Sequence, residues 1–296
     1  MRPDLAGLLP EWGRHLKAER KAPATVDLYL RGVAAFLGWC GRTDTPAAVD
    51  RRTVAAFVGD LLAQGAEAAT ARAYQLAIRR YVAWLVEEGE LEADPLVGLR
   101  PPKLDQKHTP VLSDDQVRAL VKACEGKAFR DRRDEALVRL MVETGIRAGE
   151  AVALEVDDID PAAGMVLIRR GKGGKARMVP MGSQTGRAID RYLRQRRAHR
   201  LAHTPALWLA DNGRSFGYAG LHKTLQWRAQ LAGIDGFTPH QLRHTAAHRW
   251  LAAGGSEGGL MAVAGWSRRE MLDRYARVTR AERAAEEARR LALGDL

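Results

Sequence analysis

The residues best suited to chemistry lie in one stretch, 238–278. It opens on Thr238, followed by a proline, with Gln241 three residues after the threonine, which is the pattern of a capped helix start. His240 and Arg243 are three apart, so they project from the same face of the first turns. Free N–H groups and the positive end of the helix dipole add to them. The pattern predicts an anion site, most naturally for a phosphate, although a local helix-end role fits it equally well.

The second half of this stretch adds two aromatic side chains. Ser267, with a glutamate three residues later, predicts a second capped helix over about 268–278 that carries Tyr275 near its far end. Trp266 stands just before this cap. Taken alone, Tyr275 shares its spacing with apolar residues and is more typical of a core tyrosine. Trp266 alone is more typical of a hydrophobic staple against Met271, and that role is compatible with a functional one.

The elements that must position these side chains are helices with one small sheet. Ser113 begins a capping box, Gly145 is the predicted C-cap of the helix before it, and Arg147 opens a short helix. The hydrophobic period changes to that of strands after Glu155, and a glycine-rich turn at 171–174 joins the last two strands. The predicted helices are 113–124, 130–144, 147 onward, 185–199, 218–232 and the tail 280–293, and the predicted strands are 156–159, 165–169 and 176–180.

The N-terminal third reads as a bundle of four helices joined by short links. They are predicted at 4–20, from 23 to about 37, at 51–64 with Asp50 as the cap, and at 68–88. Basic residues of the last helix (Arg72, Arg79 and Arg80) are candidates to face DNA phosphates, although each alone is more typical of a solvated face. Prolines at 95–110 predict an extended linker, and we place the domain boundary near 105. The predicted fold is mainly α with a small β-sheet, a helical bundle over 1–105 and an α+β domain over 106–296.

Charge is spread unevenly along the 296 residues. Residues 1–105 hold 14 basic and 14 acidic side chains, whereas residues 106–296 hold 33 and 22, which is the whole net charge of +11. A basic second half is typical of a protein that binds a polyanion such as nucleic acid, although a basic surface alone does not require one. The two cysteines, Cys40 and Cys124, match no disulfide or metal spacing and favour a reducing cytosol. Neither a membrane-spanning run nor a signal peptide is predicted.

Four motifs in order make this chain resemble the tyrosine recombinases, that is, phage integrases and Xer-type recombinases. TGIRAGE at 144–150 resembles the first-arginine box, and GKGGK at 171–175 resembles the β-hairpin that carries a lysine. HQLRH at 240–244 resembles the box with histidine and the second arginine. GW at 265–266, with a tyrosine nine residues later, resembles the final box. The resemblance covers nearly the whole chain, and its short layout is that of the Xer-like members.

The resemblance implies a reaction at a DNA phosphodiester without a metal or nucleotide cofactor. Arg147 and Arg243 would stabilise the dianionic transition state, for which forked guanidinium donors are suited. Tyr275 would attack the phosphorus and form a 3′-phosphotyrosyl enzyme. His240 would be its general base and Lys172 the acid for the departing 5′-oxygen.

The remaining site residues would support this reaction. Trp266 occupies a place where many relatives carry histidine, and its indole N–H can donate to a phosphate oxygen but cannot exchange protons. Glu150 would orient neighbouring groups, and His244 would support the site rather than react. Lys175 is the rival of Lys172, and only the resemblance favours the latter.

The resemblance also implies partners and a location. Two domains per protomer would clamp each double-stranded recombination site, with four protomers on synapsed DNA and a monomer or weak dimer when free. An accessory directionality factor, docking of the tail 281–296 on a neighbouring protomer, and a cytoplasmic, nucleoid-associated location are further expectations. The target sequence and the choice between integration, excision and dimer resolution stay open.

Two other functions compete with this interpretation. A DNA-binding regulator or decayed recombinase would bind without cutting, and Trp266 and the glycine-rich segment 254–259 leave it open. A metal-dependent nuclease would need clustered carboxylates among the site residues, and none is found there. His199 and His203, four apart, have no third ligand in view, so we expect them to be exposed to solvent.

Overall fold

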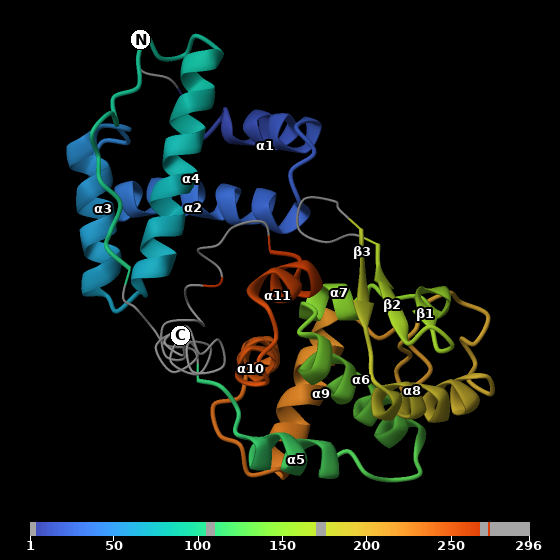
Figure 1. Ribbon diagram of the computed structural model, residues 1–296. Helices are drawn as coiled ribbons and strands as arrows, with labels where there is room; N and C mark the ends of the chain where they lie inside the picture. The colour runs from blue at the N-terminus through green and yellow to red at the C-terminus, as the bar shows by residue number, and fades with distance from the viewer. Residues whose placement is uncertain (1–3, 105–109, 170–175, 267–271, 273–296) are drawn as a thin grey trace, which may run out of the picture. The chain divides into compact units, whose positions relative to one another are not determined.

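The computed structural model describes residues 4–104, 110–169, 176–266 and 272. The chain divides into two compact units, Met1–Lys107 and His108–Leu296, and each has a hydrophobic core of its own. The fold is mainly helical with one small sheet, as the sequence predicts (Figure 1). Across the described ranges, no helix is both long enough and apolar enough to cross a bilayer.

The first unit consists of α1 (Leu9–Ala18), α2 (Pro23–Arg42), α3 (Arg51–Ala63) and α4 (Ala68–Glu87). The two long helices, α2 and α4, pack closely because α2 carries Gly32 at the contact (Figure 1). A Cβ on Gly32 would lie 2.8 Å from the Cβ of Ala77 on α4. The predicted bundle is therefore confirmed. Its first helix is shorter than the predicted 4–20, since residues 5–8 form turns before α1.

Aromatic side chains fill this core. Trp12, Phe36, Phe57 and Tyr81 are almost completely buried, and the rings of Trp12 and Tyr81 lie with centroids 4.9 Å apart. The buried hydroxyl of Tyr81 donates a 2.7 Å hydrogen bond to the carbonyl of Leu5, which satisfies the one polar atom of that side chain. This bond ties the segment before α1 to α4.

The segment after α4 is only partly the extended linker that its prolines predict. Leu96 is fully buried in the first core, and residues 95–98 form a turn. Gln75 and Arg79 of α4 donate to the carbonyls of Arg100 and Leu99, at 3.2 Å in each case. The prediction of a linker from residue 95 was therefore wrong for its first part, because one apolar side chain docks that part on the bundle.

The second unit is built around α6 (Phe129–Thr144), whose residues are buried on nearly all sides. The other helices are α5 (Asp114–Lys122), α7 (Ala148–Val152), α8 (Ser183–Arg196), α9 (Tyr218–Leu231), α10 (Pro239–Ala252) and α11 (Glu257–Ala264). A buried ion network joins α6 to α9: the carboxylate of Asp134 forms ion pairs with Arg133, at 2.7 Å, and with Arg228, at 2.8 Å. Each buried charge here has an opposite partner, as burial requires.

The sheet is antiparallel, in the order β1-β2-β3. Its strands are β1 (Ile159–Asp160), β2 (Met165–Ile168) and β3 (Arg177–Pro180), with Val166 opposite Val179. The predicted strand 156–159 was wrong, because Val156–Asp158 is a 3₁₀ turn. The carboxylate of Asp158 accepts from the backbone N–H of Glu155 at 2.8 Å, which closes a local turn in place of a strand.

The predicted helix ends are confirmed where their caps are described. Asp50 accepts from the N–H of Thr53, Ser113 forms a reciprocal capping box with Gln116, and Gly145 has a left-handed φ of 62°. Helix α11 was not predicted. The predicted turn at 171–174, the helix 268–278 and the tail 280–293 lie outside the described residues.

His199 is partly buried, whereas the sequence predicted that it would be exposed. Its Nδ1 accepts from the N–H of Leu201 at 3.1 Å, so its Nε2 carries the proton and donates to the carbonyl of Ala210 at 2.9 Å. Its ring stacks on Phe129. His199 thus holds the loop after α8, while His203 is exposed as expected. Cys40 and Cys124 are both free and buried.

Candidate active site

Arg243 lies where two helices end. Its side chain is on α10 and only 4% exposed, and its guanidinium reaches the C-terminal ends of α6 and α11. Nη1 donates to the carbonyl of Gly145 at 2.6 Å, and Nη2 donates to the carbonyl of Ala264 at 2.8 Å. Helix C-termini carry carbonyls that lack helical partners and partial negative charge, which a guanidinium satisfies. These two bonds fix the plane of the guanidinium.

The turn between α6 and α7 needs a glycine to come this close to α10. Gly145 is left-handed, and a Cβ on it would lie 3.1 Å from the Cβ of Ala246. Arg147, two residues later, is the residue before α7. The first-arginine box therefore places Gly145 and Arg147 on one tight turn, and the second arginine is bonded to that same turn.

Arg147 is held by Glu150. The Nη1 of Arg147 lies 2.9 Å from Oε1 of Glu150, and the backbone N–H of Arg147 donates to Oε2 at 2.9 Å. The Arg147 side chain is 28% exposed, whereas that of Glu150 is 6% exposed. The arginine therefore faces solvent in part, and the carboxylate behind it is buried.

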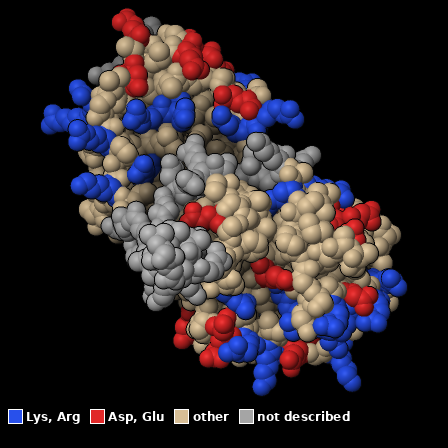
Figure 2. Space-filling model, viewed as in Figure 1, with Lys and Arg blue, Asp and Glu red and all other residues tan. Residues whose placement is uncertain are grey.

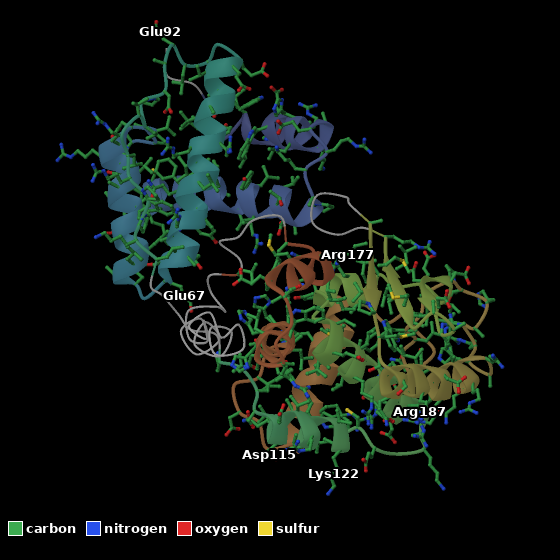
Figure 3. The ribbon with its side chains drawn as sticks, in the orientation of Figure 1. Glu67, Glu92, Asp115, Lys122, Arg177 and Arg187 are labelled. Carbon is green, nitrogen blue, oxygen red and sulfur yellow. The ribbon has the colours of Figure 1, made fainter. Side chains whose placement is uncertain are left out.

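Glu150 also accepts from a third donor that no sequence pattern indicated, Arg177 at the start of β3. Its two Nη atoms lie 3.1 and 2.8 Å from the two carboxylate oxygens. Figure 3 shows Arg177 where β3, α7 and α11 meet. Burial, the largest influence, raises the pKa of Glu150, but the hydrogen bonds from Arg177 and Arg147 together with the charge of Arg177 outweigh it and lower the pKa below its ordinary value.

Trp266 is buried and adjoins Arg243. Its ring lies 5.2 Å from the Cζ of Arg243, and its backbone N–H donates to the carbonyl of Met261 at 2.9 Å. The preceding Gly265 is left-handed and ends α11. Trp266 also joins a small apolar cluster with Leu251, Leu260 and others, so it serves the packing of α10 against α11.

The two histidines of the second-arginine box lie together. His240 is exposed and His244 is buried, and their ring centroids are 4.4 Å apart at a nearly perpendicular angle. Gln241 caps the helix start, since its Oε1 accepts from the N–H of Thr238 at 2.8 Å. The structure thus separates His240 and Arg243 by burial: the histidine faces solvent, and the arginine is directed inward toward two carbonyls.

The glycine-rich segment 254–259 has a packing role. Ser256 caps α11 by accepting from the N–H of Gly259 at 3.0 Å, and the indole of Trp250 donates to the carbonyl of Ser256. A Cβ on Gly255 would overlap the Trp250 ring, and one on Gly259 would lie 2.9 Å from it. The glycines therefore let the Trp250 ring cover the start of α11.

The structure links Arg147, Glu150, Arg243 and Trp266 through α7, α10 and α11. A small pocket lined by Gly145, Arg243 and Trp266, among others, lies between these segments. Lys172, its rival Lys175, Met271 and Tyr275 lie outside the described residues. No group of three or more potential metal ligands occurs in the part of the chain that the structure describes.

Acidic and basic side chains occupy different parts of the first unit, although residues 1–105 have a net charge of zero. Figure 2 shows acidic side chains gathered at the end of this unit where α4 stops, with basic ones farther along it. The exposed acidic residues there include Glu87, Glu88, Glu90 and Glu92, and Arg72 and Arg80 are exposed earlier on α4. The net charge of residues 1–105 did not reveal this separation, because it adds the acidic run after α4 to the basic residues earlier on that helix.

Comparison with known proteins gives consistent results. The model described as "Phage integrase family" matches residues 110–282, and that of the phage integrase N-terminal SAM-like domain matches residues 9–89. Tyrosine recombinase XerC of Pseudomonas fluorescens is 30% identical over 250 residues, which is 82% of each chain.

Two solved structures share the fold. The XerH site-specific recombinase bound to a palindromic difH substrate has a TM-score of 0.75 at 20% identity, covering 94% of this chain and 83% of that one. A lambda integrase tetramer bound to a Holliday junction has a TM-score of 0.69 at 16% identity, covering 89% and 77%. At these identities the likeness establishes the architecture.

Proposed function

The chain belongs to the phage integrase family, and from that membership we propose that it is a site-specific DNA recombinase that cuts and rejoins DNA through a covalent phosphotyrosine. The observation that carries the proposal is the turn at Gly145–Arg147. Arg147 stands on it, and Arg243, from a segment 98 residues away, is hydrogen-bonded to it. Two arginines beside one turn suit a phosphate that gains charge in its transition state.

The reaction proceeds by exchange of one ester for another. The phenolic oxygen of Tyr275 forms a bond to phosphorus and its proton passes to His240, while the bond from phosphorus to the 5′-oxygen breaks. Lys172 gives a proton to that oxygen, which leaves as a 5′-hydroxyl. A 5′-hydroxyl of the second DNA end later attacks the phosphotyrosine and restores a diester. The energy of the bond is kept throughout, so no nucleotide cofactor is required.

Residues around the arginines serve their placement. Glu150 holds Arg147 from behind, Trp266 packs beside Arg243, and His244 supports the ring of His240. The exposure of His240 leaves it accessible to DNA, as a base acting on a tyrosine beside bound DNA must be.

The partners follow from the same proposal. The bundle, residues 1–105, and the catalytic domain, residues 106–296, bind double-stranded recombination sites, and four protomers act on synapsed DNA. The basic residues of α4, away from its acidic end, support a DNA-facing surface on the bundle. The protein works in the cytoplasm, associated with the nucleoid.

The test uses a negatively supercoiled plasmid that carries the chain's recombination site. Wild-type protein relaxes the plasmid and leaves protein covalently attached after detergent quenching, with EDTA present. Tyr275→Phe binds the plasmid but gives neither product. If Tyr275→Phe relaxes the plasmid like wild type, the nucleophile is wrong. If wild type binds and never cuts, the chain is a DNA-binding protein, and if EDTA abolishes cutting, it is a metal-dependent nuclease.

A further inference from the structure

Arg177 makes three hydrogen bonds that join three separate segments. Its two Nη atoms contact the two oxygens of Glu150, and its Nε donates to the carbonyl of Val263 at 2.8 Å. The side chain is only 11% exposed. A planar guanidinium that is bidentate on one side and bonded through Nε on another has a single orientation.

The carboxylate that Arg177 grips is the one that holds Arg147. Oε1 of Glu150 is shared by Arg177 at 3.1 Å and Arg147 at 2.9 Å. Arg147 is more exposed than Arg177, at 28% against 11%, so Arg147 is the outer and Arg177 the inner of the two cations. Without Arg177 the carboxylate would keep its bonds to Arg147 alone and could rotate with it.

The same guanidinium lies against the turn that leads to Trp266. A Cβ on Gly265 would lie 3.0 Å from the Cζ of Arg177, so the two are in close contact. The last carbonyls of α11 are shared between two arginines: that of Val263 accepts from Arg177 and that of Ala264 from Arg243. Arg177 therefore lies next to the segment that carries Trp266, the aromatic neighbour of Arg243.

The position of Arg177 in the chain completes the arrangement. It is the first residue of β3, the strand that follows segment 170–175. The Arg177 side chain thus connects the start of β3, Glu150, which holds Arg147, and the end of α11. We infer that Arg177 is a positioning residue that sets the orientation of Arg147, through Glu150, and the course of the turn before Trp266.

This inference rests on the proposed function, and its test separates the two. The probe is a negatively supercoiled plasmid, assayed for relaxation, for covalent adduct and for binding by filter retention. Arg177→Ala is expected to slow adduct formation by about 100-fold, the loss typical of a displaced reacting group, with plasmid affinity changed by less than about 3-fold. Arg177→Lys is expected to recover little, because an ammonium cannot bridge both carboxylate oxygens.

A chemical rescue distinguishes positioning from general stability. Guanidinium ion added at low millimolar concentration is expected to restore part of the Arg177→Ala rate, whereas urea, which is planar but neutral, is not. The matched control is Arg169→Ala at the other side of the hairpin. Arg169 pairs with Glu155 and Asp158 rather than Glu150, and its removal is expected to leave the rate within about 3-fold.

Three outcomes would overturn the inference while the proposed function stands. Arg177→Ala could form adduct as fast as wild type. The rate of adduct formation by Arg177→Ala could fall only as much as that of Arg169→Ala and in step with its melting temperature, with no rescue by guanidinium ion. Its plasmid affinity could fall in proportion to the rate, which would make Arg177 a DNA contact. A wild type that forms no adduct on a plasmid carrying its recombination site would instead remove the proposed function itself.

Discussion

Replacement of Arg243 by lysine tests whether one guanidinium organises the site. The variant keeps the positive charge but loses the fork that reaches two helix ends at once. In the native protein Nη1 and Nη2 contact the carbonyls of Gly145 and Ala264 at 2.6 and 2.8 Å, and the residue is 4% exposed. A single ammonium can satisfy one of these carbonyls and leaves the other without its charged donor.

The size of the effect follows from that lost bond. A hydrogen bond from a charged donor contributes about 1.5–3 kcal/mol, so we expect Arg243→Lys to lower the free energy of unfolding by about 2 kcal/mol. For a unit of this size that corresponds to a fall in melting temperature of about 4–8 °C. Relaxation of supercoiled plasmid is expected to fall by about 100–1000-fold, as when an oxyanion donor is removed.

The assay pairs calorimetry with plasmid relaxation, both at a temperature where the variant is fully folded. Arg249→Lys on the same helix is the matched control, because that side chain is 48% exposed and forms a surface ion pair with Asp114. It should change neither measurement appreciably. An Arg243→Lys protein that melts with wild type and relaxes plasmid at the wild-type rate would refute the reasoning. A thermal loss without a catalytic one would confine Arg243 to a structural role.

Three further outcomes are expected. Gly32→Ala should destabilise the first unit by about 1–3 kcal/mol in urea unfolding, because the added Cβ would meet Ala77. Gly59→Ala is the control: it has open space around it in α3 and should stabilise the unit by about 0.5–1 kcal/mol. Equal effects of the two substitutions would contradict the close packing of α2 against α4. Folding lowers the pKa of Glu150, so its contribution to stability is present above its unfolded pKa and is lost as pH falls through the folded pKa. Glu150→Gln should therefore flatten the acid side of a plot of unfolding free energy against pH. An acid side that is unchanged in the variant would count against this. Burial raises the pKa of Cys124 to about 12, so a thiol reagent at mildly alkaline pH should modify it only after unfolding.

Much of the fold was predictable because helix ends are decided locally. Asp50, Ser113 and Gly145 act on groups within a few residues of themselves, so their types and spacing were sufficient. The prediction failed where longer-range packing decided. Leu96 docks on the bundle although prolines surround it, and α11 forms although glycines fill its start, because Trp250 covers them.

The candidate site was predictable as a set of residues but not as an arrangement. The boxes named Arg147, Glu150, Arg243 and Trp266, and the structure joins them through contacts between helix ends. Arg177 had no signal of its own, since an arginine at a strand start is ordinary and its partner Glu150 is 27 residues away. The assignments of Lys172 and Tyr275 stay predictions from the sequence.

The amino-acid order by itself determined the helices with local caps, the order of the four motifs and the excess of basic charge in the second half. Only the tertiary structure decided which carbonyls Arg243 binds and that one carboxylate serves both Arg147 and Arg177. The physical reason is range. Caps and turns are set by neighbours along the chain, whereas a buried ion pair exists only after packing has brought distant segments together and removed the water between them.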